Sequence, residues 1–222
     1  MAMENKILIK LEYGIVEIEL FSDNAPKHVE RILTLSKNKE YDGVVFHRVI
    51  DGFMAQTGDV KFGNSSAESF DLRRAGMGGS DLPDLKQEFN NLPHDRGTLS
   101  MARSQDPNSA NSQFFICFEP APFLDRQYTV FGKVIEGMEF VDKIKRGDSN
   151  NNGAVTDPDK ITYYKSLVIP PAWHNVTISS NPNKKILVIR NTTERREILK
   201  SGIVILSKTN RFGLLSLSGM TL

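Results

Sequence analysis

The stretch that decides the fold is residues 46–59, "FHRVIDGFMAQTGD". It sets one permanent cation, Arg48, among apolar side chains, and Asp51-Gly52 divides it into two strand-like halves. Asp-Gly is favourable turn chemistry between strands. An arginine between strand residues is usually a surface cation whose aliphatic stem packs on its neighbours. The stretch alone therefore predicts short strands around a turn, but no function.

The segments upstream of this stretch predict a hairpin and then a helix. "KILIKLEYG" and "IVEIELF" join near Gly14, and the second run alternates apolar and polar residues, as half-buried antiparallel strands do. Residues 22–38, "SDNAPKHVERILTLSKN", offer Asp23 or Asn24 as the N-cap and Pro26 in the first turn. These signals predict one amphipathic helix.

Downstream, short strand candidates predominate: "GTLSMA", "SQFFICF", "YTVFGKV" and "KITYYKSLVI". A second helix is predicted at residues 137–147, "GMEFVDKIKRG", and residues 60–95 are expected to be mostly loop. Many short strands with only two helices indicate a mainly β fold. We expect an antiparallel barrel or sandwich, because alternating βαβ units would need more helices.

The composition is that of a globular chain with an uneven distribution of charge. Of the 222 residues, 39% are hydrophobic and 25% are charged, and the net charge is +1. From Pro171 onward there are eight Lys or Arg against two Glu, which leaves 20 basic and 25 acidic residues upstream. We therefore expect a domain over residues 1–170 and a basic extension over 171–222, loosely packed or disordered. The extension has no aromatic interleaving or binding motif that would indicate nucleic acid.

Several kinds of site lack the residues that they need. The four histidines show neither HExxH spacing nor a cysteine partner for zinc, and no GxSxG motif is present. The single cysteine, Cys117, excludes an internal disulfide and is expected to be a small buried hydrophobe. No signal peptide and no run of 18 apolar residues is found. These features favour a cytoplasmic location without membrane contact.

Four motifs together are specific. "FHRVIDGFMAQTGD", "GTLSMARS", "NSANSQFFICF" and "FLDRQYTVFGKVIEGMEFVDKI" resemble, in order and spacing, the cyclophilin family of peptidyl-prolyl cis/trans isomerases. The resemblance covers about residues 6–169. It implies an eight-stranded antiparallel barrel capped by two helices, followed here by the C-terminal extension.

The resemblance also implies a site. Arg48 matches the catalytic arginine, and further positions match the groove that binds proline. The substrate-binding residues implied in this way are His47, Phe53, Met54, Gln56, Ala102, Arg103, Gln113, Phe115, Phe123, Leu124 and Tyr128.

The chemistry of these residue types agrees with this implied function. Rotation about an X-Pro bond crosses a barrier of about 18–20 kcal/mol that amide resonance creates. In the twisted transition state the prolyl nitrogen regains its lone pair and can accept a hydrogen bond, which an arginine can donate without acting as a base. An apolar floor would hold the pyrrolidine ring and exclude water. Such a reaction needs no metal and no cofactor.

Three positions depart from the members of the family that bind cyclosporin and resemble its bacterial branch. Phe123 replaces a tryptophan, Tyr128 a histidine and Arg103 an asparagine. Because phenylalanine lacks the indole N–H, we expect weak cyclosporin binding. The expected partners are proline-containing peptides and folding proteins, and the chain is expected to be a monomer. The alternative function is a module that binds proline-containing segments, or a chaperone, without catalysis.

Overall fold

The computed structural model describes residues 5–68 and 70–168. The chain divides after Val168, close to the predicted boundary at residue 170. The basic extension, residues 171–222, lies outside the described residues, so its expected loose packing stays a prediction.

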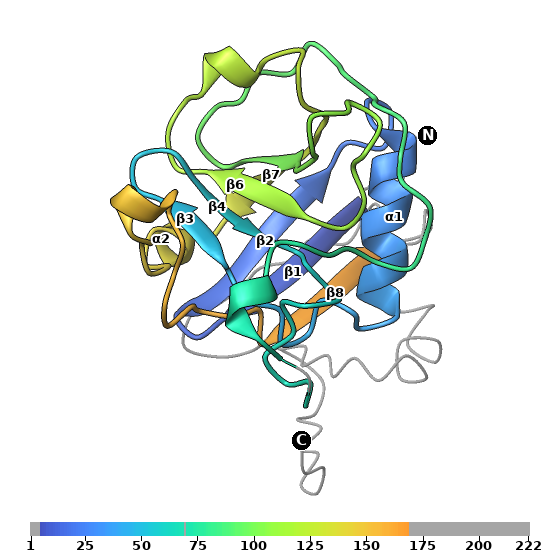
Figure 1. Ribbon diagram of the computed structural model, residues 1–222. Helices are drawn as coiled ribbons and strands as arrows, with labels where there is room; N and C mark the ends of the chain where they lie inside the picture. The colour runs from blue at the N-terminus through green and yellow to red at the C-terminus, as the bar shows by residue number, and fades with distance from the viewer. Residues whose placement is uncertain (1–4, 69, 169–222) are drawn as a thin grey trace, which may run out of the picture. The chain divides into compact units, whose positions relative to one another are not determined.

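Antiparallel strands dominate the described residues (Figure 1). They are β1 (Asn5–Leu11), β2 (Gly14–Leu20), β3 (Arg48–Ile50), β4 (Met54–Thr57), β5 (Thr98–Met101), β6 (Phe114–Cys117), β7 (Val130–Glu136) and β8 (Tyr163–Val168). They form one sheet in the order β3-β4-β6-β5-β7-β2-β1-β8. The predicted mainly β class is confirmed. The expected antiparallel barrel is corrected to a curled half-barrel, because β3 and β8 are edge strands that do not pair with each other.

The first helix, α1 (Pro26–Lys37), begins in a different way from the prediction. Its N-cap is Ala25 rather than Asp23 or Asn24, and that residue gives no side-chain cap. The carboxylate of Glu88, from the long loop, instead accepts hydrogen bonds from the backbone N–H groups of Lys27 and His28 at 3.0–3.1 Å. A distant carboxylate thus does the work of the cap and also complements the positive end of the helix dipole.

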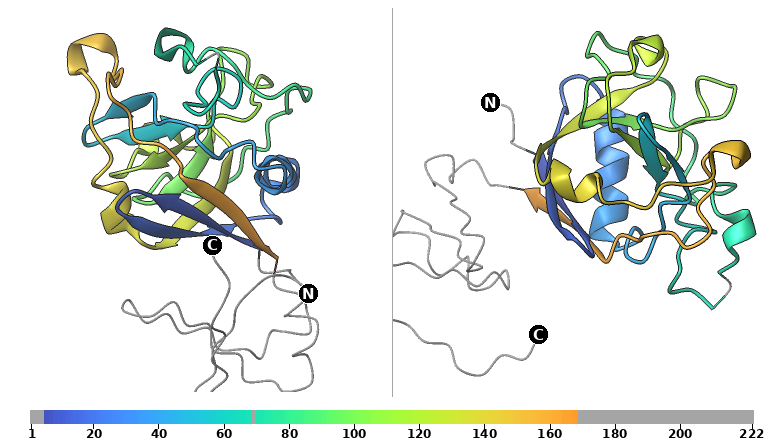
Figure 2. Two further views of the ribbon diagram at one scale, coloured as in Figure 1. Left: turned by 90° about the horizontal axis from the view of Figure 1, so that it is seen from below. Right: turned by 90° about the vertical axis from the view of Figure 1, so that its left-hand side faces the viewer.

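The second helix, α2 (Met138–Val141), is a single turn and shorter than the predicted 137–147. The Arg146 guanidinium donates to the carbonyl oxygens of Asp142 and Ile144 at 2.9 and 2.6 Å. These oxygens would otherwise accept N–H groups of a continuing helix, so the arginine ends it. In the right-hand view of Figure 2 the strands curl around the core, with α1 behind them and α2 in front.

Three short 3₁₀ helices, which the sequence did not predict, interrupt the loops: η1 (Leu72–Arg74), η2 (Pro122–Leu124) and η3 (Ser149–Asn151). Residues 60–68 and 70–95 are otherwise loop, as predicted. Two of these 3₁₀ helices, η2 and η3, carry or adjoin residues of the candidate site described below.

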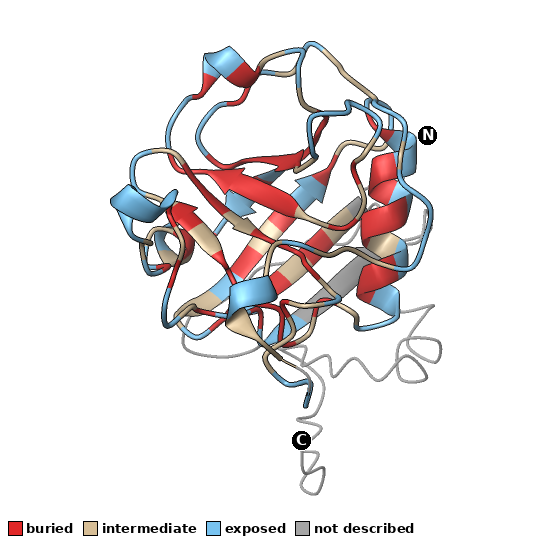
Figure 3. Ribbon diagram, viewed as in Figure 1, coloured by how far each residue is buried: buried red, intermediate tan, exposed pale blue. Residues whose placement is uncertain are grey.

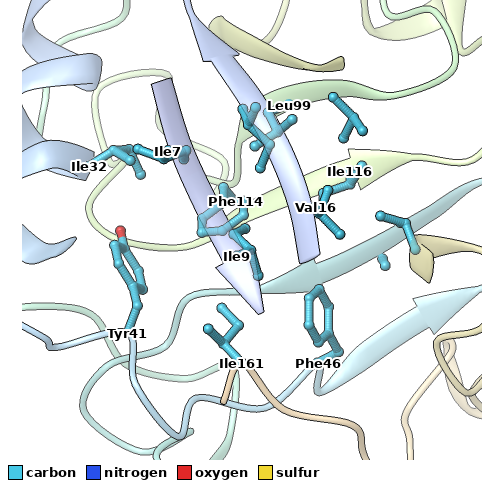
Figure 4. Close-up of a cluster of buried hydrophobic side chains, with 14 of the residues drawn as sticks. Ile7, Ile9, Val16, Ile32, Tyr41, Phe46, Leu99, Phe114, Ile116 and Ile161 are labelled. Carbon is cyan, nitrogen blue, oxygen red and sulfur yellow. The ribbon is translucent and has the colours of Figure 1, made fainter. Parts of the chain in front are cut away.

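The buried residues, which Figure 3 colours red along the strands and α1, form two apolar clusters. Within the curl, side chains from the strands, α1 and two loops point toward one another in a main core (Figure 4), including Ile7, Ile9, Val16, Ile32, Tyr41, Phe46, Leu99, Phe114, Ile116 and Ile161. A smaller cluster on the other face contains Met54, Phe115, Cys117, Ala121 and Leu124. Because successive side chains of a strand alternate between faces, β6 contributes Phe114 to the first cluster and Phe115 to the second.

Candidate active site

Three neighbouring strands bring the central residues of the site together. In the register of β3 with β4, Arg48 lies opposite Gln56, and in the register of β4 with β6, Gln56 lies opposite Phe115. Directly opposed residues share one face of a sheet. The three side chains therefore stand in a row across the outer face.

A cavity of about 300 Å³ opens along this row. Its floor is apolar, and Arg48 and Gln56 lie at its polar side. The lining residues are Arg48, Phe53, Met54, Gln56, Ala102, Arg103, Phe115, Phe123, Leu124 and Tyr128. Ten of the twelve residues expected at the site thus surround one cavity.

The rim of the cavity is aromatic. The rings of Phe53 and Phe123 lie 5.4 Å apart, and Phe115 meets Tyr128 edge to face at 5.9 Å. Phe123, which η2 carries, is 63% exposed. The Arg103 guanidinium lies 4.4 Å from the centre of the Tyr128 ring, an attractive cation–π contact. The cavity is therefore open to solvent above a buried floor.

The guanidinium of Arg48 is half-buried and held by oxygen acceptors. Nη1 donates to Oε1 of Gln56 at 3.2 Å, Nε donates to the backbone oxygen of Asn152 at 3.0 Å, and Nη2 donates to Oδ1 of Asn152 at 2.9 Å. Burial lowers the pKa of Arg48 from its ordinary value. Arginine nevertheless remains protonated at neutral pH, so a cation stays beside the apolar floor.

A chain of hydrogen bonds fixes the orientation of the two glutamine amides. Nε2 of Gln113 donates to the backbone oxygens of Gly76 and Gly78 at 2.9 and 2.7 Å, which turns its Oε1 toward Nε2 of Gln56 at 2.9 Å. The oxygen of Gln56 then faces Arg48. The orientation of the amide beside the guanidinium is thus set by the backbone of the long loop.

A buried carboxylate, Asp59, holds that loop in place. It is fully buried, and its oxygens accept backbone N–H groups of Lys61, Phe62, Gly76 and Gly78 at 2.8–3.1 Å. Four such bonds satisfy a buried charge. Sequence reasoning did not single out Asp59, although it ends the opening stretch.

A second cavity of about 270 Å³ adjoins the first. Gln113, which does not line the first cavity, lines this one. Its lining residues are Gln56, Gly76, Met77, Gly78, Ala102, Arg103, Ser104, Ser109, Asn111 and Gln113. Gln56, Ala102 and Arg103 line both cavities, so the two cavities lie side by side.

His47 lies apart from both linings. It is 8% exposed and buried beside Gly76, where a side chain on the glycine would meet its Nε2 at 2.8 Å. Burial lowers the pKa of His47 to about 4. The structure therefore places this histidine, a neutral ring at pH 7, behind the loop and not on the surface of the groove.

A second histidine, His94, lies beneath the floor. Its ring stacks on Phe115 with centres 6.2 Å apart, and its nitrogens lie 2.9 Å from Oδ1 of Asp125 and 3.0 Å from Oγ of Ser100. The contact between His94 and Ser100 could not be predicted from the sequence. His94 and Ser100 are 1% and 0% exposed, so no substrate reaches them as nucleophile and base, and the arrangement supports the floor.

Cys117 also lies beneath the floor, opposite Met54 in the register of β4 with β6. It is buried, as predicted, and burial raises the pKa of its thiol to about 12. Within residues 5–68 and 70–168, no group of three or more His, Cys, Asp or Glu side chains is arranged to hold a metal ion. None of the helices described has the length and apolar character needed to cross a bilayer.

The fold and the site thus combine a curled antiparallel sheet with an arginine that lies beside an aromatic, apolar cavity. The family model described as "Cyclophilin type peptidyl-prolyl cis-trans isomerase/CLD" matches residues 6–166. The chain therefore belongs to the cyclophilin-type peptidyl-prolyl cis-trans isomerase family. A second model, of the N-terminal domain of bacterial DNA topoisomerase IB, matches only residues 149–189.

Individual relatives agree with this assignment. The chain is 60% identical over 158 residues to a probable peptidyl-prolyl cis-trans isomerase of Brucella suis, which covers 71% of this chain and 80% of that protein. A cyclophilin crystal structure from Hirschia baltica matches with a TM-score of 0.61 and 25% identity, covering 76% of this chain and 75% of the other. A cyclophilin-type isomerase of Cryptosporidium parvum, crystallised in the presence of the dipeptide Ala-Pro, matches with a TM-score of 0.60 and 31% identity, covering 72% and 96%.

Proposed function

We propose that this protein accelerates rotation about X-Pro bonds in peptides and folding proteins, with Arg48 as the essential hydrogen-bond donor. The observation that carries the proposal is the position of its guanidinium at the polar side of the cavity of about 300 Å³. Phe53, Met54, Phe115 and Leu124 supply the apolar floor of that cavity.

The floor suits the pyrrolidine ring of proline. An apolar pocket with a few oriented polar groups holds a small ring and excludes water from it. Exclusion of water strengthens the interaction between the guanidinium and the charge that develops on the prolyl nitrogen. The site thus favours the twisted amide over either planar isomer, which is what lowers the barrier.

The proposed reaction involves no proton transfer. The lone pair of the prolyl nitrogen exists only while the amide is twisted, and Arg48 donates a hydrogen bond to it at that stage without releasing a proton. No covalent intermediate forms. The reaction proposed for this groove draws on no metal and no cofactor.

The proposed substrates are proline-containing segments, and the relative crystallised with Ala-Pro supports this choice. We propose weak cyclosporin binding, because Phe123 at the rim offers no N–H donor. Cytoplasmic location and a monomeric state stay predictions.

Exchange NMR of an Ala-Pro or Gly-Pro peptide tests the function. The full chain is expected to accelerate cis/trans exchange, and Arg48→Ala is expected to remove most of that acceleration while the protein still binds the peptide. If Arg48→Ala leaves the rate unchanged, the proposed mechanism is wrong. If the wild type binds the peptide without accelerating exchange, the alternative of a proline-binding module or chaperone is supported.

A further inference from the structure

We propose that Asn152 is a positioning residue, which with Gln56 fixes the guanidinium of Arg48 and leaves one N–H of Nη2 free to meet the prolyl nitrogen. The inference rests on the proposed function of Arg48. Asn152 follows η3 and is 104 residues away from Arg48 in the sequence. Its contribution therefore depends on the fold.

The five N–H groups of the Arg48 guanidinium differ in whether the protein already supplies an acceptor. A guanidinium has five N–H groups. Asn152 accepts from two of them, through its backbone oxygen and its Oδ1, and Gln56 accepts from a third. The other N–H of Nη1 faces the sulfur of Met54 at 4.0 Å. Among the acceptors of the described chain, none is bonded to the second N–H of Nη2, so that group is available to a substrate.

The two bonds from Asn152 restrain the plane of the guanidinium. They engage Nε and Nη2, which share one edge of the group, while Gln56 engages Nη1. Contacts on two sides prevent rotation about the terminal bonds of the side chain, and such fork geometry adds direction as well as energy. A donor that is already oriented needs no reorganisation when the lone pair appears.

Asparagine meets the structural demands at this position. Residue 152 has φ +51°, in the left-handed region that asparagine tolerates better than most side chains. The adjoining backbone is fixed to β3, since the N–H of Val49 donates to the oxygen of Gly153 at 2.7 Å and the N–H of Gly147 donates to the oxygen of Val49 at 2.9 Å. Val49 directly follows Arg48, so these two hydrogen bonds hold the loop that carries Asn152 next to the arginine.

The variant Asn152→Gly tests the side chain alone. Glycine keeps the backbone oxygen and accepts the left-handed φ without strain, so the fold is expected to be retained. With the full chain and an Ala-Pro peptide, we expect kcat to fall roughly tenfold, the effect of losing one hydrogen bond to a charged group, while KM stays within about twofold. Asn152→Asp keeps an oxygen at the same place and is expected to restore most of the rate.

Asn151→Ala is the matched control. It removes the same type of side chain from the neighbouring position, where the structure shows no bond to Arg48, and is expected to leave kcat unchanged. Equal kcat values for the wild type and Asn152→Gly would overturn the inference. Equal losses of kcat in Asn152→Gly and Asn151→Ala would also overturn it.

A spectroscopic measurement separates this inference from the proposed function. In ¹⁵N-labelled protein without peptide, the Nη groups of Arg48 are expected to rotate more slowly in the wild type and in Asn151→Ala than in Asn152→Gly. Identical rotation in all three contradicts the restraint by Asn152. If the wild type does not catalyse exchange, the proposed function fails, yet the rotation rates still decide whether Asn152 holds the guanidinium.

Discussion

At the scale of single residues, Phe114 and Phe115 are neighbours in β6 that serve different parts of the molecule. Phe114 is fully buried in the main core, edge to face with Tyr41 at 5.7 Å. Phe115 forms part of the floor of the groove and is stacked on His94. Catalysis and stability should therefore respond differently to the same substitution at the two positions.

Phe114→Leu and Phe115→Leu form a matched pair that tests this division. Phe114→Leu leaves a closed void and is expected to cost about 1–3 kcal/mol of unfolding free energy, with little loss of isomerase activity in the folded protein. Phe115→Leu enlarges a cavity that is already open, so we expect a smaller loss of stability and a larger fall in kcat/KM. Urea unfolding and peptide exchange measured on both variants check the prediction, and the same ranking in both assays would contradict it.

His47 gives a prediction about pH. Its folded-state pKa, about 4, lies below its ordinary value of 6.5 because burial disfavours the charged ring. The unfolded chain therefore binds the proton more readily. The contribution of the neutral ring to stability is complete above about pH 6.5 and is lost as the pH falls toward about 4.

When the pH is lowered from 7 to 4.5, we expect the urea concentration at the midpoint of unfolding to decrease. The decrease should be smaller in His47→Gln than in the wild type. His28 is also buried with a lowered pKa, so comparison of the variant with the wild type isolates the part that belongs to His47. A pH dependence that is the same in both proteins would assign the effect to other groups.

At the scale of elements, α1 depends on a residue far away in the sequence. Glu88→Ala leaves the N–H groups of Lys27 and His28 without their acceptor and removes the partner 2.7 Å from Nδ1 of His28. We expect a loss of about 1–2 kcal/mol, the usual effect of removing a helix cap. Glu30→Ala, which removes an exposed carboxylate from the same helix, should cost less. Thermal unfolding of the two variants makes the comparison.

The long loop should depend on Asp59 in the same way. Asp59→Asn puts an amide where four backbone N–H groups now converge, and at least one of them would lose its acceptor. The expected cost is about 2–3 kcal/mol for a buried unsatisfied group. Isomerase activity should fall too, because Gly76 and Gly78 orient the amide of Gln113.

Asp71→Asn is the control for this change. It alters the same residue type in the same loop, but at a position where the carboxylate bonds exposed Arg73. Hydrogen exchange of the loop amides, together with activity, should separate the two variants. Equal protection in Asp59→Asn and the wild type would show that the loop does not need this carboxylate.

The sequence predicted the elements more accurately than the ways in which they end. Alternation of apolar residues predicted the first hairpin. The match of motifs named Arg48, Gln56 and Phe115, but their arrangement in one row came from the structure. The cap from Glu88 and the early end of α2 at Val141 could not be predicted, because both depend on partners brought near by the fold. Asn152 was missed for the same reason, although its place before Gly153 in a turn-like "NNG" was a signal for a left-handed residue.

At the scale of the whole molecule, the groove and its support lie within the described residues. The family model ends at residue 166 and β8 ends at Val168. Deletion of residues 171–222 is therefore expected to leave peptide isomerisation within about twofold of the full chain. A large loss on deletion would show that the extension completes the fold or the site.

The open edge at β3 has a consequence for how client chains can bind. An exposed edge strand normally invites another chain to extend the sheet, which leads to aggregation or to recognition by strand addition. In β3 the backbone N–H and oxygen of Val49 are already bonded to Gly153 and Gly147. An extended chain therefore cannot join the sheet at Val49, and the edge beside the candidate site offers no template for a growing β assembly.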